Sequence, residues 1–292
     1  MRSRAIRNES PASTARIRID LLMFALVTAL ISGSLWLVLA WIGGDVTEGG
    51  SLAIFAVATS GPSLAALILY LTRTRRMPSS APRHPVSAPW LWLPAVLVLG
   101  AAPVVVANLI VAPESLGAQI AEVPDIVEGF GGTAMFIVLF MIAGPLAEEF
   151  GWRGYAQPRL RRSLGLLATS ALLGAAWWAW HIPLFFLPGT GQAAMGFFSL
   201  ESLGFALSFI PLSLIYLFVS ERLGGGVWAA ILLHFSVNAV WTLLPDESLA
   251  VGAARLVIIW LLAAGVYFAW RPEARQPLGP WPIREPPQSV TV

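Results

Sequence analysis

The chain alternates between long apolar runs and short polar segments over most of its length. The runs are close to the roughly 20 residues that an α-helix needs to cross a lipid bilayer. We therefore predict an all-α, polytopic membrane protein with about eight transmembrane helices. Their approximate limits are residues 21–42, 52–72, 90–112, 132–150, 164–182, 203–219, 226–244 and 252–270. The fourth helix can continue to about Gln157, ahead of Pro158.

The two ends of the chain differ from this apolar part. Residues 1–18 are polar and rich in arginine, and residues 271–292 contain six prolines and no apolar period. Such sequences cannot bury enough apolar surface to fold. We expect both ends to be disordered, on either side of a transmembrane domain at residues 19–270.

The arginines predict how the helices are oriented. All 18 basic residues are Arg, and 17 of them fall on the side of the N-terminus if the eight helices alternate in direction. Arg255 is the exception. Because arginines gather in cytoplasmic loops, we expect a multi-pass protein of the cell membrane with both termini in the cytoplasm.

Composition excludes several classes of protein. Charged residues make up 12% of the chain and hydrophobic residues 57%, whereas soluble domains have about 25% charged residues. The absence of cysteine excludes disulfides, thiolate nucleophiles and cysteine-ligated metals. Composition therefore predicts the lipid bilayer as a partner, and no nucleic acid.

The fourth run ends in a charged motif, EEFGWRGY, at residues 148–155. Charged side chains are expensive in hydrocarbon and mark functional positions. Glu149 and Arg153 are four residues apart, the spacing of an ion pair on one helical face. Glu148 points about 100° away from Glu149, toward the face of Trp152 and Tyr155, so we interpret it as the carboxylate that is free for chemistry.

Three more polar residues lie within the apolar runs. His181 ends the fifth run, and His234 and Asn238 lie one helical turn apart in the seventh. Each alone is often only an interhelical hydrogen bond, worth about 0.6 kcal/mol. Together they favour another interpretation, since a carboxylate and a histidine can activate water, and a histidine–asparagine pair can stabilise an oxyanion. These are the parts of a peptidase without a covalent nucleophile.

The tryptophans near His181 have a simpler interpretation. Trp177, Trp178 and Trp180 precede it in the fifth run. Tryptophan is common at membrane interfaces and in helix packing, so we expect these three residues to be interface or packing residues.

These motifs resemble those of the CPBP family of intramembrane proteases, which includes the type II CAAX prenyl proteases and the Abi-type bacteriocin-immunity proteins. The resemblance covers about residues 130–245. It rests on three motifs, formed by Glu148, Glu149, Arg153 and Tyr155, by Trp177 and His181, and by His234 and Asn238. Trp177 stands where the second motif more often has phenylalanine.

The resemblance implies a role for each motif. Glu148 and His181 would bind and activate the attacking water, and His234 and Asn238 would bind the oxyanion. The remaining motif residues would support the site structurally; they are Glu149, Arg153, Tyr155 and Trp177. The activity that the resemblance implies is cleavage of a membrane-associated peptide or protein, so the implied substrate partner is a peptide or a lipid-modified protein.

Two other functions stay open at this stage. The chain could be a non-catalytic scaffold or bacteriocin-immunity protein that binds a partner, or a transporter that uses Glu148 and the histidines as a proton relay. A zinc cofactor also stays open, with Glu148, His181 and His234 as its ligands.

The depth of His181 raises a difficulty for the water-binding role. It lies about 25 Å up the fifth helix at 1.5 Å per residue, and thus near the outer face. Glu148 is expected in the cytoplasmic half, so the two would meet if the fourth helix is long and the fifth is tilted or begins late.

Overall fold

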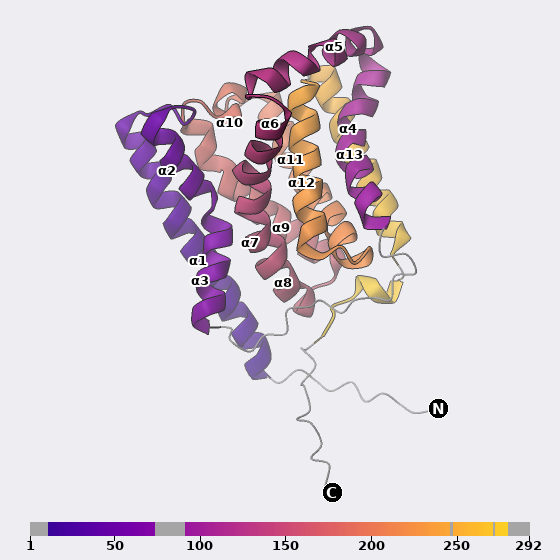
Figure 1. The fold of residues 1–292 in the computed structure, drawn as a ribbon. Coiled ribbons are helices and arrows are strands. Elements are labelled where there is room, and N and C mark those ends of the chain that lie inside the picture. The colour runs from indigo at the N-terminus through magenta and orange to yellow at the C-terminus, as the bar shows by residue number, and fades with distance from the viewer. Residues whose placement is uncertain (1–10, 74–90, 246–247, 271, 280–292) are drawn as a thin grey trace, which may run out of the picture.

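The computed structural model describes residues 11–73, 91–245, 248–270 and 272–279, and this part of the chain is helical without any strand (Figure 1). Six helical stretches are long and apolar enough to cross a membrane, so the chain is an all-α polytopic membrane protein. They are Ala15–Ile42, Trp92–Val111, Thr133–Ser163, Leu200–Arg222, Gly226–Leu243 and Leu249–Ala269. In the order of the chain they correspond to α1, α4, the helix from α6 to α8, α11 with η5, α12 and α13.

The predicted count of eight spans is not reached by these helices alone. A seventh span results if α2 (Gly49–Thr59) and α3 (Gly61–Arg73), which meet at a 50° bend, are taken together. The remaining predicted span, at residues 164–182, corresponds to α9 (Leu166–His181), which is only 16 residues long. Because about 20 residues are needed to cross a bilayer, α9 alone is too short to count.

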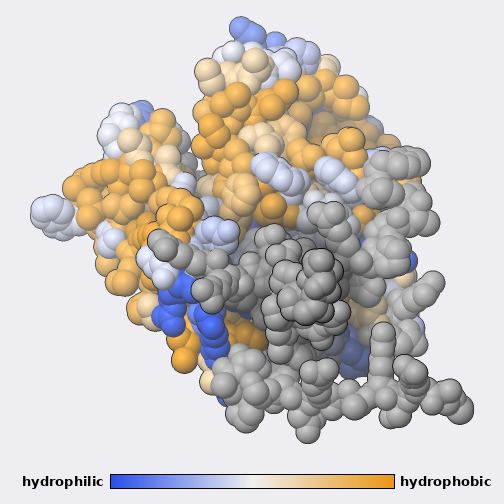
Figure 2. Space-filling model, turned by 60° about the horizontal axis from the view of Figure 1, so that its bottom comes forward, coloured by the Kyte–Doolittle hydropathy of each residue, from blue (hydrophilic) through white to orange (hydrophobic). Residues whose placement is uncertain are grey.

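The outer sides of the helices are apolar, as a lipid-facing surface requires. Leu37, Trp41 and Phe268 are 73%, 86% and 74% exposed, and they lie on α1 (Pro11–Ile42) and α13 (Leu249–Ala269). Water would disfavour such exposure, whereas lipid tails do not. Figure 2 shows apolar residues covering the sides of the bundle and strongly hydrophilic residues at the end that comes forward.

Both predicted disordered ends are partly ordered, which corrects the expectation. Helix α1 already begins at Pro11, and Ile17 and Asp20 on one of its faces are buried. At the other end Pro272–Arg275 forms a short 3-10 helix, η6, and the Leu278 amide donates to the Arg161 carbonyl at 2.8 Å. These contacts with distant helices cannot be read from a polar local sequence. Residues 1–10 and 280–292 lie outside the described residues.

A helical stretch of 31 residues runs through the charged motif from Thr133 to Ser163, and so extends beyond the limit predicted at Gln157. It consists of α6 (Thr133–Met141), η2 (Ile142–Leu146), α7 (Ala147–Gly151), η3 (Trp152–Ala156) and α8 (Gln157–Ser163). The two η segments are π-helical turns, and they flank the glutamates on either side. Pro145 lies in the first, where it removes a backbone donor, and π-turns of this kind are frequent at functional sites.

The connection between α8 and α9 removes the difficulty of depth. Only Leu164 and Gly165 separate the two helices, so they run back along one another. Glu148 lies 15 residues before Ser163, and His181 lies 15 residues after Leu166. At 1.5 Å per residue, each is about 22 Å from the turn. The two residues are therefore at similar heights in the bundle.

Close backbone contacts fix the helices around the motif. A β-carbon at Gly151 would lie 2.4 Å from the backbone of Pro62 in α3. One at Gly174 in α9 would lie 2.7 Å from Ile210 in α11 (Leu200–Leu217). Glycine is therefore required at both positions. The remaining described helices are α4 (Trp92–Val111), α5 (Pro113–Gly129), η4 (Ile182–Phe186), α10 (Gly191–Met195), η5 (Phe218–Arg222) and α12 (Gly226–Leu243).

Candidate functional site

The two glutamates of the motif lie inside the bundle. Glu148 is 5% exposed and Glu149 is fully buried. The ion pair predicted from their spacing is present, with Arg153 Nη1 donating to Glu149 Oε1 at 3.1 Å. Because neither side of this pair reaches water, the pair must be stabilised by its protein surroundings.

Aromatic rings provide much of that stabilisation. The Arg153 guanidinium lies 4.0 Å from the centroid of the Trp177 ring and 4.0 Å from that of Tyr216. A guanidinium is attracted to the negative face of an aromatic ring, more strongly when water is excluded. Within the described residues, Nε and Nη2 of Arg153 have no hydrogen-bond acceptor, and Glu149 Oε2 has no donor.

His234 approaches the same carboxylate from α12. Its Nδ1 lies 2.8 Å from Glu149 Oε1, the oxygen that also accepts from Arg153. The spacing rule identified only Arg153 as a partner of Glu149, because it sees contacts within one helix. Glu149 therefore links the glutamate motif to the histidine motif.

Gly144 lies next to Nε2, the ring nitrogen of His234 that does not contact Glu149. A β-carbon built on it would be 3.3 Å from His234 Nε2 and 3.3 Å from Asn238 Nδ2. The two polar atoms thus converge on one point, as their one-turn spacing predicted. Gly144 was missed in the sequence, although a Gly-Pro pair inside an apolar helix was a usable signal.

Trp177 corrects the expectation that the tryptophans of this run are interface or packing residues. It is 4% exposed, and its indole Nε1 donates a hydrogen bond of 2.6 Å to Glu148 Oε2. The ring also lies 5.5 Å from that of His234. The sequence motif indicated an aromatic residue near His181, but it did not indicate that its indole donates a hydrogen bond to Glu148.

His181 lies one turn after Trp177 on α9. Its Nδ1 is 2.8 Å from the Trp177 carbonyl oxygen. Since a carbonyl can only accept, Nδ1 carries the proton, and Nε2 of the neutral ring is an acceptor. The His181 ring packs against Phe209 and Trp180, with centroids 4.9 Å away in both cases.

Tyr155 does not join this group. Its ring stacks on Phe24 of α1 at 5.3 Å, and the Arg159 guanidinium lies 3.3 Å above it. The π-turn at η3 separates Tyr155 from Glu148 and interrupts the regular helical period on which the shared face was predicted. A different tyrosine, Tyr216 on α11, contacts Arg153 instead.

The proposed zinc ligands do not fit a metal site as they are placed here. Within the described residues, no three His, Asp or Glu side chains are grouped as metal ligands are. Glu148 Oε2 accepts a hydrogen bond from Trp177, and His234 Nδ1 is hydrogen-bonded to Glu149, so neither of these two atoms is directed at a shared metal ion. We therefore derive no step through a metal.

Comparison with known proteins agrees with these three motifs. Residues 130–240 match the family described as type II CAAX prenyl endopeptidase Rce1-like. The matched region contains the glutamate motif, both histidines and Asn238. The chain is also 32% identical over 145 residues to CAAX prenyl protease 2 of Methanococcus maripaludis.

Over the matched part, this chain is similar to the type II CAAX prenyl proteases. The alignment with the archaeal relative covers 47% of this chain and 52% of the relative, so the chain spans about half of the length of that protein. The family match covers residues 130–240, and the candidate site lies within these residues.

Proposed function

We propose that this chain is an intramembrane endopeptidase in which Glu148 and His181 activate a water molecule. The observation that carries the proposal is the convergence of buried polar side chains from three separate helices. Glu148 lies on α7, His181 on α9 and His234 on α12, and all three contact Trp177. Burying these groups is costly, and packing alone gives no reason for it.

Two acceptors are available for the attacking water. Trp177 donates to Oε2 of Glu148, which leaves Oε1 as the basic oxygen. His181 uses Nδ1 for the Trp177 carbonyl, which leaves the Nε2 lone pair. Water donates one hydrogen to each group and directs its own lone pair at the substrate. The similar heights of Glu148 and His181 in the bundle support this role.

His234 and Asn238 form the proposed oxyanion site. Both polar atoms lie 3.3 Å from the position of a Gly144 β-carbon, so a substrate oxygen near this point could accept from both. Because Nδ1 of His234 donates to Glu149, a second donor at Nε2 requires the imidazolium form. With that charge, two carboxylates face one guanidinium and one imidazolium, and the buried cluster is neutral.

The reaction then follows without a covalent intermediate. Glu148 accepts a proton as the water oxygen bonds to the carbonyl carbon of the scissile peptide. The resulting oxyanion accepts hydrogen bonds from His234 and Asn238. When the C–N bond breaks, Glu148 returns the proton to the leaving amine, and a carboxylic acid and an amine are released.

The substrate we propose is the lipid-modified C-terminus of a membrane-associated protein or peptide. The support is the name of the archaeal relative, CAAX prenyl protease 2, and the position of the site within a lipid-facing bundle. A substrate chain that carries a lipid can partition into the bilayer and reach the glutamates laterally.

A peptide panel tests this function. The purified protein is reconstituted in lipid vesicles with matched peptides that end in a CAAX sequence, either prenylated or unmodified. Mass spectrometry should detect a released C-terminal tripeptide from the prenylated peptide only. Absence of cleavage in every peptide would instead favour a binding or immunity protein, and substrate flux coupled to a proton gradient would favour a transporter.

The same assay tests the role of metal. Exhaustive chelation should leave cleavage unchanged, and mass spectrometry should find less than stoichiometric zinc. Activity that is lost on chelation and restored by zinc would overturn the proposed roles of Glu148, His181 and His234.

A further inference from the structure

Trp177 contacts three of the proposed catalytic residues, Glu148, His181 and His234. Its indole N–H bonds to Glu148, and its backbone carbonyl accepts from His181. Its ring lies against the Arg153 guanidinium and the His234 imidazole. One buried residue thus contacts both groups to which we assign the water.

From this geometry we propose that Trp177 is a positioning residue, which fixes the Glu148 carboxylate through Oε2 and leaves Oε1 to act as the base. The inference deepens the proposed function and rests on it. Trp177 itself takes no proton in the reaction. It acts through the carboxylate that it orients.

A carboxylate in this position needs such an orienting contact. The terminal torsion of a glutamate side chain has a broad, roughly two-fold profile, so its two oxygens can exchange places. A hydrogen bond from a neutral donor to a charged acceptor is short and strong, and the 2.6 Å distance to Trp177 fits this type. Among the described residues, no other side chain donates to Glu148.

The hydrogen bond also stabilises the charged form of Glu148, which is the form that acts as a base. Other groups around this carboxylate remain when the indole is replaced. They are Glu149 and Arg153 on the same long helix, His234 on α12 and Tyr216 on α11. These charges stay in place and phenylalanine keeps an aromatic ring beside Arg153 and His234, so the change at Glu148 itself is the loss of the N–H donor.

Helix α9 offers a matched control in the next residue. Trp178 is half-buried, and its Nε1 has no hydrogen-bond acceptor among the described residues. Trp177→Phe and Trp178→Phe remove the same atoms from neighbouring positions. Only the first removes a hydrogen bond.

The test compares the two variants with the parent in vesicles, using the cleaved peptide of the panel across a range of pH. Trp177→Phe should lower kcat about tenfold at neutral pH, the low end for losing a hydrogen bond to a charged group, with little change in KM. The acid limb of its rate profile should move to higher pH, so that part of the activity returns in alkaline buffer. Trp178→Phe should match the parent.

Two results with the single Trp177→Phe variant would overturn the inference. One is a Trp177→Phe variant with the activity and pH profile of the parent. The other is a uniform loss at every pH together with a lower melting temperature, which would indicate packing alone. In a Glu148→Gln background, Trp177→Phe should have no further effect on residual cleavage, and an additional loss would also contradict an action through Glu148.

A spectroscopic readout separates this inference from the proposed function. With indole ¹⁵N labelling, the Trp177 signal is the one that is missing in Trp177→Phe. Glu148→Gln should shift this signal, whereas Glu122→Gln on the exposed face of α5 should not. A signal that does not shift overturns the contact, whatever the activity. A shifted signal in a protein that cleaves no peptide would contradict the proposed function and leave the contact established.

Discussion

The described part of the chain contains two buried arginine–glutamate pairs that are built in different ways. One is Arg153 with Glu149 at the candidate site, and the other is Arg161 with Glu221 at the end of the bundle where α8 turns into α9. The side chains of Arg153 and Arg161 are 1% and 0% exposed, so burial does not distinguish them. Their hydrogen bonds do.

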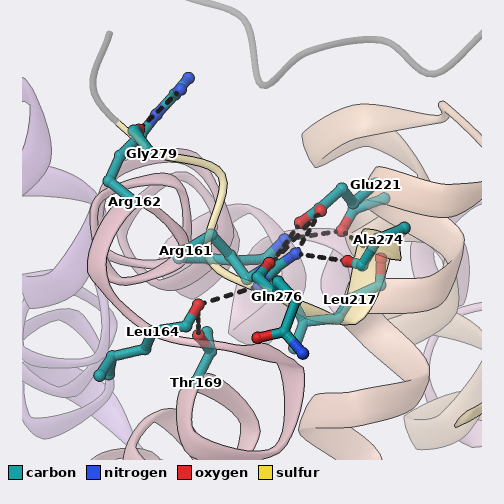
Figure 3. Close-up of polar contacts among 11 residues, drawn as sticks. Arg161, Arg162, Leu164, Thr169, Leu217, Glu221, Ala274, Gln276 and Gly279 are labelled. Atoms are coloured by element: carbon teal, nitrogen blue, oxygen red, sulfur yellow. Dashed lines mark hydrogen bonds and ion pairs between the residues drawn. The ribbon is translucent and has the colours of Figure 1, made fainter. Parts of the chain in front are cut away.

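Arg161 uses every nitrogen of its guanidinium. Nε and Nη2 donate to Glu221, and the remaining donors bind the carbonyls of three residues from two other segments (Figure 3). These carbonyls belong to Leu164, Ala274 and Gln276. The pair therefore joins α8, η5 and the C-terminal segment. A buried ion pair whose hydrogen bonds are all satisfied makes the fold more rigid.

Among the described residues, Arg153 donates only one hydrogen bond, to Glu149, and the rings of Trp177 and Tyr216 lie against its guanidinium. Two of its nitrogens have no acceptor in the described part of the chain. Glu149 in turn is shared with His234. We infer from this comparison that the Arg153 pair balances charge at the candidate site, whereas the Arg161 pair stabilises the fold.

The largest effect on stability should come from Arg161→Met. Glu221 loses its only ion-pair partner among the described residues, and three carbonyls lose the hydrogen bonds that Arg161 donates to them. Breaking a buried pair on one side costs about 3–5 kcal/mol. Thermal unfolding in detergent measures this loss.

The control for this change is the double variant Arg161→Met with Glu221→Gln. It removes the unpaired buried charge and should recover part of the lost stability. A single Arg161→Met variant that is as stable as the parent would show that the Arg161–Glu221 pair does not stabilise the fold.

Arg153→Met should cost less stability, about 2 kcal/mol, because a buried hydrogen bond to a charged group is lost while Glu149 keeps His234 as its partner. It should also reduce cleavage, because the charge balance around His234 changes. Unfolding and kcat measured on the same preparation test this prediction. An activity equal to that of the parent would contradict the charge-control role.

Gly144→Ala should affect activity without affecting the fold. The added methyl group would lie 3.3 Å from His234 Nε2 and from Asn238 Nδ2, where the substrate oxygen is proposed to bind. We expect about a tenfold fall in kcat/KM, equivalent to about 1.4 kcal/mol. Gly154→Ala is the control, since its β-carbon meets only ordinary contacts at 3.7 Å. Equal activity in the two variants would place the oxyanion elsewhere.

The smallest effect should come from shortening the C-terminus. Removing residues 276–292 deletes the Gln276 carbonyl and the Leu278 amide that bind Arg161. At about 1 kcal/mol for a net hydrogen bond, a loss of about 1–2 kcal/mol should appear in thermal unfolding, with cleavage unchanged. Removing only residues 280–292 is the control, so the difference between the two measures residues 276–279. Equal melting temperatures of the two truncated proteins would mean that residues 276–279 do not contribute to stability.

The sequence predicted the site better where the contacts are local. The Glu149–Arg153 pair follows from spacing on one helix, and so does the common face of His234 and Asn238. The bonds from Glu149 to His234 and from Trp177 to Glu148 join residues 85 and 29 positions apart. No periodicity within a helix reports such contacts.

The absence of long-range information in a local sequence pattern also explains the errors in the predicted fold. Arg159, Arg161 and Arg162 stand close together in a polar segment, and nothing local shows that Arg161 is completely buried. The prolines of the C-terminal segment indicated disorder because the partner that orders residues 272–279 is more than 100 positions away. The apparent depth of His181 was misleading because the length of the helix from Thr133 to Ser163 was underestimated.

The most direct test of the account is the turnover of Glu148→Gln on the prenylated peptide, measured beside its melting temperature. Glutamine keeps the size of the side chain and can still accept from Trp177, but it cannot take a proton from water. The account predicts loss of at least about a thousandfold in kcat, within the range for general-base catalysis, and an unchanged melting temperature. Glu122→Gln should cleave like the parent. A folded Glu148→Gln protein that retains normal turnover would contradict the assignment of Glu148 as the base.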